Sequence, residues 1–409
     1  MDDTTRAVEA VVRSSYGRLV SYLSARSGDV AGAEDALSEA FVAALRTWPT
    51  DGVPTKPEAW LLHAARRRLI DRIRQARTRH EHASLLGAVM AEAEELSSAR
   101  MFPDERLELL FVCAHPAIDP RVHTPLMLQV VLGLEAAAIA AVFVTPPATM
   151  GQRLSRAKTK IRETRIAFEV PMGPELSLRL SAVLEAIYGA YGHAWDDVDG
   201  ADPKRRGLSE ESIWLARTVV ELVPNEPEAS GLLALILYCE ARRSARRTAA
   251  GAYVPISEQD TRLWSKPRLE EANQLLTFAA ACGRPGRFQL EAAVQSAHIE
   301  RVLSGHVEAS AIALLYEGLV SFAPTLGALI GRAAAVAEAR GPDAGLALLE
   351  ELPDSAVQVY QPYWAARAHL CKKLGRVEDA RAAFDHALRL TDDDAVRRFL
   401  ELEVSDLVG

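Results

Sequence analysis

The sequence predicts an all-α protein with more than one domain. Alternating β-branched segments are nearly absent, and helix-period apolar patterns broken by Gly, Pro and Asp run along the whole chain. A chain of 409 residues exceeds what one hydrophobic core usually holds, and 49% apolar with 25% charged residues is a globular composition. We therefore expect two or three helical domains.

Targeting and metal signals are missing from the sequence. No charged segment followed by an apolar run opens the chain, and the most apolar stretch, residues 130–144, is short for a membrane span and contains Glu135. The four cysteines lie far apart without a metal-ligand spacing. We expect a cytoplasmic protein with no metal, no cofactor and no membrane association.

The first informative element is a helix predicted over residues 29–48, DVAGAEDALSEAFVAALRTW. Its apolar stripe contains Leu37, Ala40, Phe41, Ala44, Leu45 and Trp48, and its opposite side contains Glu34, Asp35, Ser38, Glu39 and Arg46. An acidic edge beside apolar residues suits docking to a basic partner surface. A solvated helix face explains the same pattern.

The second element is a helix over residues 60–79, WLLHAARRRLIDRIRQARTR, which holds seven arginines. Leu62, Ala65, Leu69, Ile73 and Ala76 form the stripe expected to be buried, and Trp60, His63, Arg67, Ile70, Arg74 and Arg77 lie on another face. Guanidinium groups contact phosphates, and aromatic rings stack on unpaired bases. The helix therefore favours nucleic-acid binding, with a solvated basic face as the alternative.

Residues 81–103 form an acidic segment with few large apolar side chains, including Glu92, Glu94 and Glu95. Such a composition predicts a flexible linker. It acts either as a simple tether or, through its carboxylates, as an imitation of nucleic-acid charge.

A second basic region follows within residues 104–170. Helices are predicted over 121–132, 135–142 and, with Thr145 as N-cap, 146–165, which is the helix-turn-helix plan. On the last helix Met150, Leu154, Ala157 and Ile161 are expected to be buried, and Thr149, Gln152, Arg153, Arg156 and Lys160 face outward. Gln152 and Arg153 suit contacts to base edges, whereas Arg156, Lys158 and Lys160 suit phosphates.

The order of these segments resembles a bacterial RNA polymerase sigma factor of the extracytoplasmic-function (ECF) type. The resemblance covers residues 1 to about 168 and rests on EDALSEAF, PEAWLLHAARRRLIDRIR, ERLELLFVCAHPAI and TMGQRLSRAKTKIR. It implies that residues 1–80 are sigma region 2, a helical bundle that binds core RNA polymerase and recognises and melts the -10 element. It also implies that residues 104–170 are sigma region 4, a helix-turn-helix that reads the -35 element of promoter DNA.

The resemblance also implies roles for individual residues. Asp35, Glu39 and Phe41 match the segment that binds core polymerase. Trp60, His63, Arg66, Arg67 and Arg74 match the helix that faces the -10 element. Gln152, Arg153, Arg156 and Lys158 match the -35 recognition helix, whose outward side also carries Thr149.

The remaining residues, 171–409, differ in charge and length from the front part. They hold 25 Lys and Arg against 34 Asp and Glu, a net charge of -9, whereas residues 1–170 hold 22 against 21, a net charge of +1. The segment contains LLALILYCEARRSAR, SEQDTRLW, FQLEAAVQSAH and AAAVAEARGPDAGLALLEEL, and through them it resembles the helical C-terminal extension of one ECF subgroup. Within it, YWAARAHLCKKLGRVEDARAAFDHALRL reads as a tetratricopeptide (TPR)-like helix pair, and such repeats stack into surfaces that bind a protein partner.

A charged group inside this extension has two interpretations. Glu240, Arg242, Arg243, Arg246, Asp260, Arg262 and Trp264 predict a buried ion network or, less favoured, a small-molecule pocket.

The sequence thus predicts a transcription initiation factor rather than an enzyme, because no catalytic triad, metal motif or phosphate loop is present. A helical-repeat adaptor whose sigma-like front half lacks promoter activity is the main alternative. An ordinary helix-turn-helix repressor is a weaker one.

Overall fold

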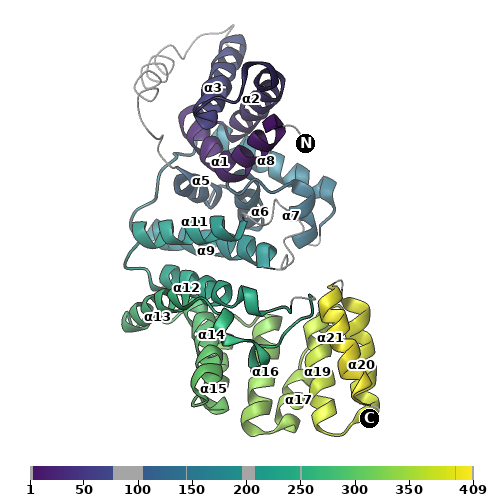
Figure 1. The fold of residues 1–409 in the computed structure, drawn as a ribbon. Coiled ribbons are helices and arrows are strands. Elements are labelled where there is room, and N and C mark those ends of the chain that lie inside the picture. The colour runs from purple at the N-terminus through teal and green to yellow at the C-terminus, as the bar shows by residue number, and fades with distance from the viewer. Residues whose placement is uncertain are drawn as a thin grey trace. The chain divides into compact units, whose positions relative to one another are not determined.

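The computed structural model describes residues 3–76, 105–143, 145–195, 208–248, 251–391 and 393–407, and its regular elements there are helices (Figure 1). Extended pairing in these ranges is limited to one isolated antiparallel bridge between Arg247 and Tyr253. The all-α prediction is therefore confirmed. The chain divides into two compact units, Met1–Thr218 and Val219–Gly409.

Three helices form a bundle at the start of the first unit. Helix α1 packs against α2 and α3, which also pack against each other, and Leu19, Leu37 and Leu61 are fully buried. The Asp29 carboxylate caps α2 by accepting a hydrogen bond of 3.1 Å from the Gly32 amide. The bounds are Asp3–Ser27 for α1, Val30–Asp51 for α2 and Pro57–Ala76 for α3.

The buried stripe of α3 differs by one position from the expected one. Leu61, Ala65 and Leu69 are buried, whereas Leu62 is half-buried. Leu61 and Leu62 lie four and three residues before Ala65, so both could share its face, and packing of α3 against α1 and α2 decides which one is buried. The side chains of Ile73 and Ala76 lie outside the described residues.

The next described helices are α5 to α8, and the ranges of the last three agree with the helices expected over 121–132, 135–142 and 146–165. Helix α6 packs against α5, α7 and α8, and α7 packs against α8. The predicted stripe of α8 is confirmed, since Met150, Leu154, Ala157 and Ile161 are buried. Its N-cap is Pro146 rather than Thr145, whose hydroxyl instead donates to the Phe143 carbonyl. The bounds are Arg106–Cys113 for α5, Pro120–Val130 for α6, Ala136–Val142 for α7 and Pro147–Thr164 for α8.

Two more helices, α9 (Pro174–Trp195) and α11 (Leu208–Leu222), extend this unit beyond residue 170, where the sequence predicts a change of domain. Helix α9 packs against α5 and α6, and the buried Arg179 guanidinium donates to the Phe111 carbonyl. Buried Arg106 of α5 pairs with Glu211 of α11. We keep as predictions the domain limits 1–80, 81–103, 104–170 and 171–409. The first compact unit, however, continues past residue 170 to Thr218.

Helices α1 and α6 approach closely at Gly17. A Cβ atom there would clash with the Val131 carbonyl oxygen, which belongs to backbone and yields little. We expect Gly17→Ala to lower the free energy of unfolding of the first unit by about 1–3 kcal/mol, the usual cost of overpacking. Urea unfolding followed by circular dichroism measures it.

The matched control is Gly192→Ala in α9, where a Cβ would meet nothing within 4 Å. This variant should be as stable as the parent, or more stable by up to about 1 kcal/mol from helix propensity. Equal destabilisation by both variants would contradict the close approach at Gly17.

The second unit is a series of helices in which sequence neighbours pack in pairs, α12 with α13, α15 with α16, and α19 with α20 (Figure 1). The bounds are Pro227–Ala241 for α12, Lys266–Ala281 for α13, Arg287–Ser304 for α14, Ala309–Phe322 for α15, Leu326–Arg340 for α16, Pro342–Glu350 for α17, Asp354–Val357 for α18, Gln361–Lys373 for α19, Val377–Leu390 for α20 and Asp394–Ser405 for α21. Short 3-10 turns occupy Arg243–Ala245, Ile256–Glu258 and Thr261–Leu263.

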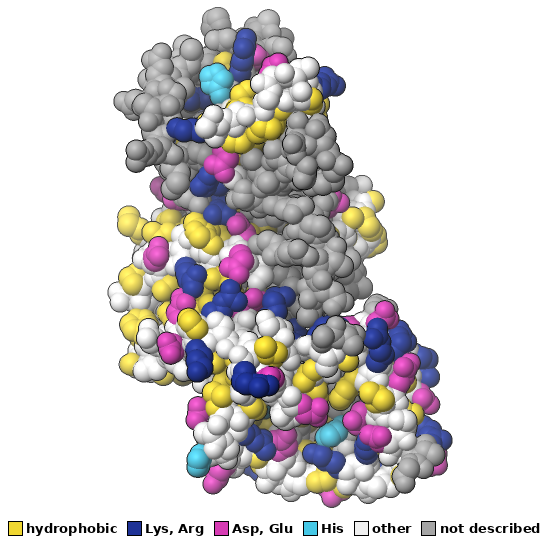
Figure 2. Space-filling view, in the orientation of Figure 1, with side chains coloured by type: hydrophobic (Ala, Val, Ile, Leu, Met, Phe, Trp, Pro, Cys, Tyr) yellow, Lys and Arg dark blue, Asp and Glu magenta, His cyan; other side chains and the backbone are white. Residues whose placement is uncertain are grey.

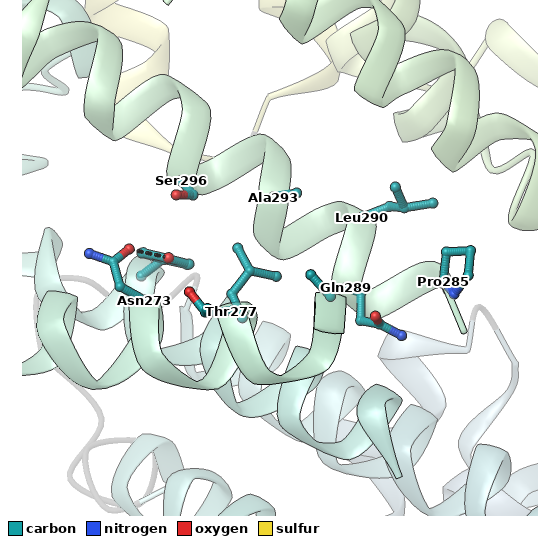
Figure 3. Close-up of a pocket in the computed structure, with 10 residues that line it drawn as sticks. Asn273, Thr277, Pro285, Gln289, Leu290, Ala293 and Ser296 are labelled. Carbon is teal, nitrogen blue, oxygen red and sulfur yellow. Dashed lines mark hydrogen bonds between the residues drawn. The ribbon is translucent and has the colours of Figure 1, made fainter. Parts of the chain in front are cut away.

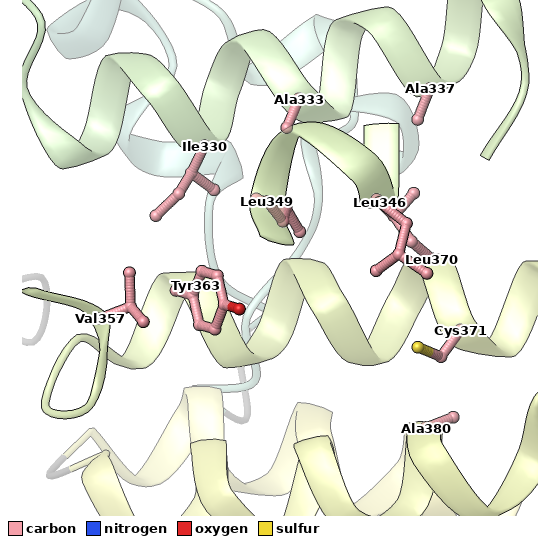
Figure 4. Close-up of a cluster of buried hydrophobic side chains, with 10 residues drawn as sticks. All are labelled: Ile330, Ala333, Ala337, Leu346, Leu349, Val357, Tyr363, Leu370, Cys371 and Ala380. Carbon is pink, nitrogen blue, oxygen red and sulfur yellow. The ribbon is translucent and has the colours of Figure 1, made fainter. Parts of the chain in front are cut away.

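One apolar cluster of this unit joins α16, α17, α19 and α20 (Figure 4). Leu370 lies on the side of α19 that faces Leu346 of α17, and Cys371 points toward Ala380 of α20. The helix pair expected near the end of the chain is therefore present as α19 and α20, joined by a turn in which Gly375 has a φ of 70°. Its assignment to the TPR class stays a prediction.

The expected charge network is present only in part. The buried Glu240 carboxylate pairs with Arg243 at 2.5 Å and Arg268 at 3.5 Å, and buried Arg242 donates to Gln295. Asp260 and Arg262 form a separate exposed pair. Glu240 thus supports the structural interpretation.

Candidate nucleic-acid interface

The first part of the candidate interface is the outward face of α3. His63 and Arg67 are exposed, whereas Trp60 and Arg66 are half-buried. The Trp60 ring lies edge-on to Trp48 of α2, with 5.5 Å between ring centroids. This contact fixes the orientation of a ring that remains partly open to solvent. Basic side chains and a histidine are visible over the region of α2 and α3 in Figure 2.

Arg74 lies in the last turn of α3, and its side chain is outside the described residues. Arg77, Arg79 and the whole predicted linker 81–103 are outside them as well.

The acidic residues expected to bind a partner lie on α2. Asp35 and Glu39 are exposed, and Phe41 is half-buried. The Glu39 carboxylate pairs with Arg68 of α3 at 3.0 Å. Because both side chains are partly exposed, this pair is weak and exchangeable.

The outward face of α8 presents most of the residues expected there. Gln152, Arg153 and Arg156 are exposed, and Thr149 is half-buried. The positions 149, 153, 156 and 160 follow one another at steps of four, three and four residues, so they lie on one face of the helix. Lys160 is exposed on this face too.

Lys158 lies on a different face of α8, where the helix packs against α2. Its Nζ atom is 2.5 Å from Glu34 Oε2, and the two side chains are 13% and 14% exposed. One turn later Arg162 lies 3.6 Å from Asp29 of α2. The structure therefore separates Lys158 from the exposed cations with which the sequence groups it.

The electrostatics around Glu34 reinforce this contact. Burial, followed by the neighbouring Glu34 carboxylate, strongly raises the pKa of the Tyr16 hydroxyl. That hydroxyl donates to Glu34 Oε1 at 3.4 Å. Glu34 is thus held between a neutral phenol of α1 and the Lys158 ammonium of α8.

A cleft of about 430 Å³ opens beside the outward face of α8. It is lined by Asp119 and Arg121 at the start of α6 and by Arg153, Arg156 and Lys160. Sequence reasoning missed Arg121. The signal was the Asp-Pro-Arg sequence at positions 119–121, which places an N-cap and a cation at a helix start.

A pocket of about 580 Å³ in the second unit has a different character (Figure 3). Its polar lining comes from uncharged side chains, Tyr238, Asn273, Thr277, Gln289 and Ser296, and the Tyr238 hydroxyl donates to Asn273 Oδ1 at 2.5 Å. Leu276, Pro285 and Leu290 add apolar surface. A pocket without cations does not suit phosphates.

Two searches of the described residues complete the picture. In that part of the chain, no cluster of three or more His, Cys, Asp or Glu side chains is arranged to hold a metal ion. Its helices include none with the length and apolar character needed to cross a membrane.

These features define an all-α protein that presents cations on two helices of one unit. Residues 11–79 match the family model for sigma-70 region 2, and residues 179–280 match a family of unknown function, DUF6596. No solved structure matches the chain significantly.

Two of the proteins similar to this chain are named as sigma factors, in agreement with the region 2 match. The probable RNA polymerase sigma-C factor of Mycobacterium bovis is 32% identical over 160 residues, which cover 37% of this chain and 80% of that protein. The probable ECF RNA polymerase sigma factor SigI of Mycobacterium tuberculosis is 29% identical over 167 residues, 40% of this chain and 57% of that protein. An uncharacterized protein of Rhizobium meliloti is 34% identical over 400 residues, 97% of this chain and 93% of that protein.

The chain belongs to the RNA polymerase sigma factor family. The relative from Rhizobium meliloti matches over nearly the whole chain, so the long C-terminal part is shared between these two proteins.

Proposed function

We propose that this protein is a transcription initiation factor of the ECF sigma type. It binds core RNA polymerase, directs it to specific promoters and assists DNA melting in the cytoplasm. The observation that carries the proposal is the exposure of His63 and Arg67 on α3 within the region 2 match. Cations on this face suit the displaced backbone, and the partly open Trp60 ring suits an unpaired base.

Helix α8 then reads the -35 element as the second helix of a helix-turn-helix. Gln152 and Arg153 are exposed in its first two turns, where a recognition helix contacts base edges in the major groove. Arg156 is exposed one turn after Gln152 and suits a phosphate.

This proposal requires the first unit to open on DNA. The -10 and -35 elements are separated by about 25 base pairs, which corresponds to about 85 Å of DNA at roughly 3.4 Å per base pair. In the free chain α2 contacts both α3 and α8, and a helix is only about 10 Å wide. Promoter binding therefore breaks the Lys158–Glu34 and Arg162–Asp29 pairs and releases Lys158 toward DNA.

Asp35, Glu39 and Phe41 of α2 form the contact to core polymerase in this proposal. Two of these side chains are exposed carboxylates, which suit a basic partner surface. We expect Asp35→Lys with Glu39→Lys to reduce copurification of core RNA polymerase with the tagged chain at least about tenfold, because like charges at an interface cost several kcal/mol.

The control exchanges two exposed carboxylates of the second unit, Glu378→Lys with Asp385→Lys on α20, and should keep copurification. If core polymerase fails to copurify even with the parent chain, the adaptor alternative gains. Retention by the Asp35/Glu39 variant would move the polymerase contact elsewhere.

The acidic C-terminal part modulates this activity in the proposal. Its net charge of -9 suits approach to basic DNA-facing helices or to a basic polymerase surface, and its helix pairs offer a surface for a protein partner.

A further inference from the structure

The cleft between α6 and α8 concentrates positive charge from two separate helices. Arg121 comes from the first turn of α6, and Arg153, Arg156 and Lys160 come from the outward face of α8. The positive end of the α6 dipole, a helix of 11 residues, lies beside Arg121. Four cations therefore share a space of about 430 Å³ with a single carboxylate, Asp119.

That carboxylate is already paired. Asp119 Oδ1 accepts from Arg121 Nε at 3.2 Å, and Oδ2 accepts from Arg121 Nη2 at 2.9 Å. The bonds from Arg121 lower the pKa of Asp119, so it stays ionised. A guanidinium has five N–H donors, and this fork leaves three of them for another acceptor. Arg121 is thus held in place while most of its donors remain free.

The α8 cations of the cleft have no such partner. Within the described residues, Arg153, Arg156 and Lys160 form no ion pair with a carboxylate, in contrast to Lys158 and Arg162 of the same helix. Arg156 and Lys160 share the cleft with the fixed Arg121 guanidinium and suit the tetrahedral anion of a phosphate, which accepts several charge-assisted hydrogen bonds, so Arg153 remains available to a base edge.

We infer that this cleft binds a backbone phosphate of promoter DNA and that Arg121 completes the site. The inference rests on the proposed function of α8. A helix in the major groove is flanked by the sugar-phosphate backbone, and the cleft lies on the flank of the face that carries Gln152 and Arg153. Arg121 then supplies a DNA contact from α6, outside the helix that reads bases.

The test is the salt dependence of promoter affinity for the holoenzyme formed with core polymerase. Arg121→Ala should lower the slope of log K against log salt by about 0.9, the value of one phosphate contact, and weaken binding about three- to tenfold. Arg121→Lys keeps the charge and should retain the slope. The Arg121 side chain is 85% exposed, so these changes leave the core intact.

Arg262→Ala is the matched control because Asp260 and Arg262 form the same fork in the second unit. Arg262 Nε lies 2.9 Å from Asp260 Oδ1, Nη2 lies 2.7 Å from Oδ2, and the arginine is 88% exposed. Its loss removes one charge and one fork without touching the cleft, so affinity and slope should equal those of the parent.

Inorganic triphosphate, titrated calorimetrically into the full chain, distinguishes the source of the phosphate. Triphosphate binding that needs Arg121, with an unchanged DNA slope, would overturn the DNA assignment, and an unchanged result in both arms would overturn the site. If promoter transcription is normal and Arg121→Ala leaves the salt slope unchanged, the phosphate site in the cleft is disproved while the proposed function stands. If Arg121→Ala lowers the salt slope but the parent chain starts no transcripts, the phosphate site is supported and the proposed function is disproved.

Discussion

Replacement of Arg67 and Arg74 by alanine is expected to abolish promoter opening, with a loss of open complex of about 100-fold. The two arginines are seven residues apart in the sequence, a spacing that predicts one shared helix face. Each bond from a charged donor contributes about 1.5 kcal/mol, and two such bonds give about 3 kcal/mol, or two factors of ten. Permanganate reactivity of unpaired thymines measures the open complex.

The control for this variant removes two exposed arginines from the second unit, Arg381→Ala with Arg398→Ala on α20 and α21. The change in net charge is the same, and opening should be that of the parent. A similar loss in both double variants would mean that total charge, rather than the face of α3, controls opening.

Truncation after Val170 is expected to prevent stable folding of the front part. Leu180, Val183 and Ile187 of α9 are buried, and α9 covers α5 and α6. Each such side chain contributes about 1.5–3 kcal/mol by burial, and a typical domain has only about 5–15 kcal/mol of stability. The cut also removes Glu211, which pairs with the buried Arg106 of α5, and Trp214, whose ring centroid lies 3.7 Å from the Arg106 guanidinium carbon.

Truncation after Asn225 keeps α9 and α11 and should give a folded, soluble fragment. Thermal unfolding monitored by circular dichroism compares the two fragments, with the full chain as reference. A cooperative transition in residues 1–170 at the temperature found for 1–225 would contradict the role of α9. The longer fragment is also the one with which to test whether the second unit modulates transcription.

Local patterns predicted helices well because each pattern depends on near neighbours. The stripe Met150, Leu154, Ala157 and Ile161 is buried as expected, since its spacing alone defines one face of α8. The stripe of α3 starts at Leu61 because adjacent leucines leave the choice to packing against other helices.

The sequence did not predict which residues far apart in the chain contact each other. Nothing near Lys158 reveals that Glu34, 124 residues earlier, pairs with it. Helix α9 follows a Pro- and Gly-containing segment that resembles a linker, yet it packs against α5 and α6. Periodicity says that a face is buried and leaves open which element covers it.

In the candidate interface, too, features that depend on local helix spacing were predicted, and features that depend on contacts between distant helices were not. Exposure of His63, Arg67, Gln152 and Arg153 follows from helix periodicity. Arg121 was missed because its role depends on a cleft shared by two helices some 30 residues apart, and the sequence carried only a helix-start signal there.

Run-off transcription is the most direct test of the central claim that this chain directs core RNA polymerase to promoters. The template is a promoter that the holoenzyme selects from randomised duplexes. The account predicts a transcript with a single defined start when core polymerase and the chain are both present, and none with core polymerase alone. Equal transcription with and without the chain, although core polymerase binds it, would contradict the account.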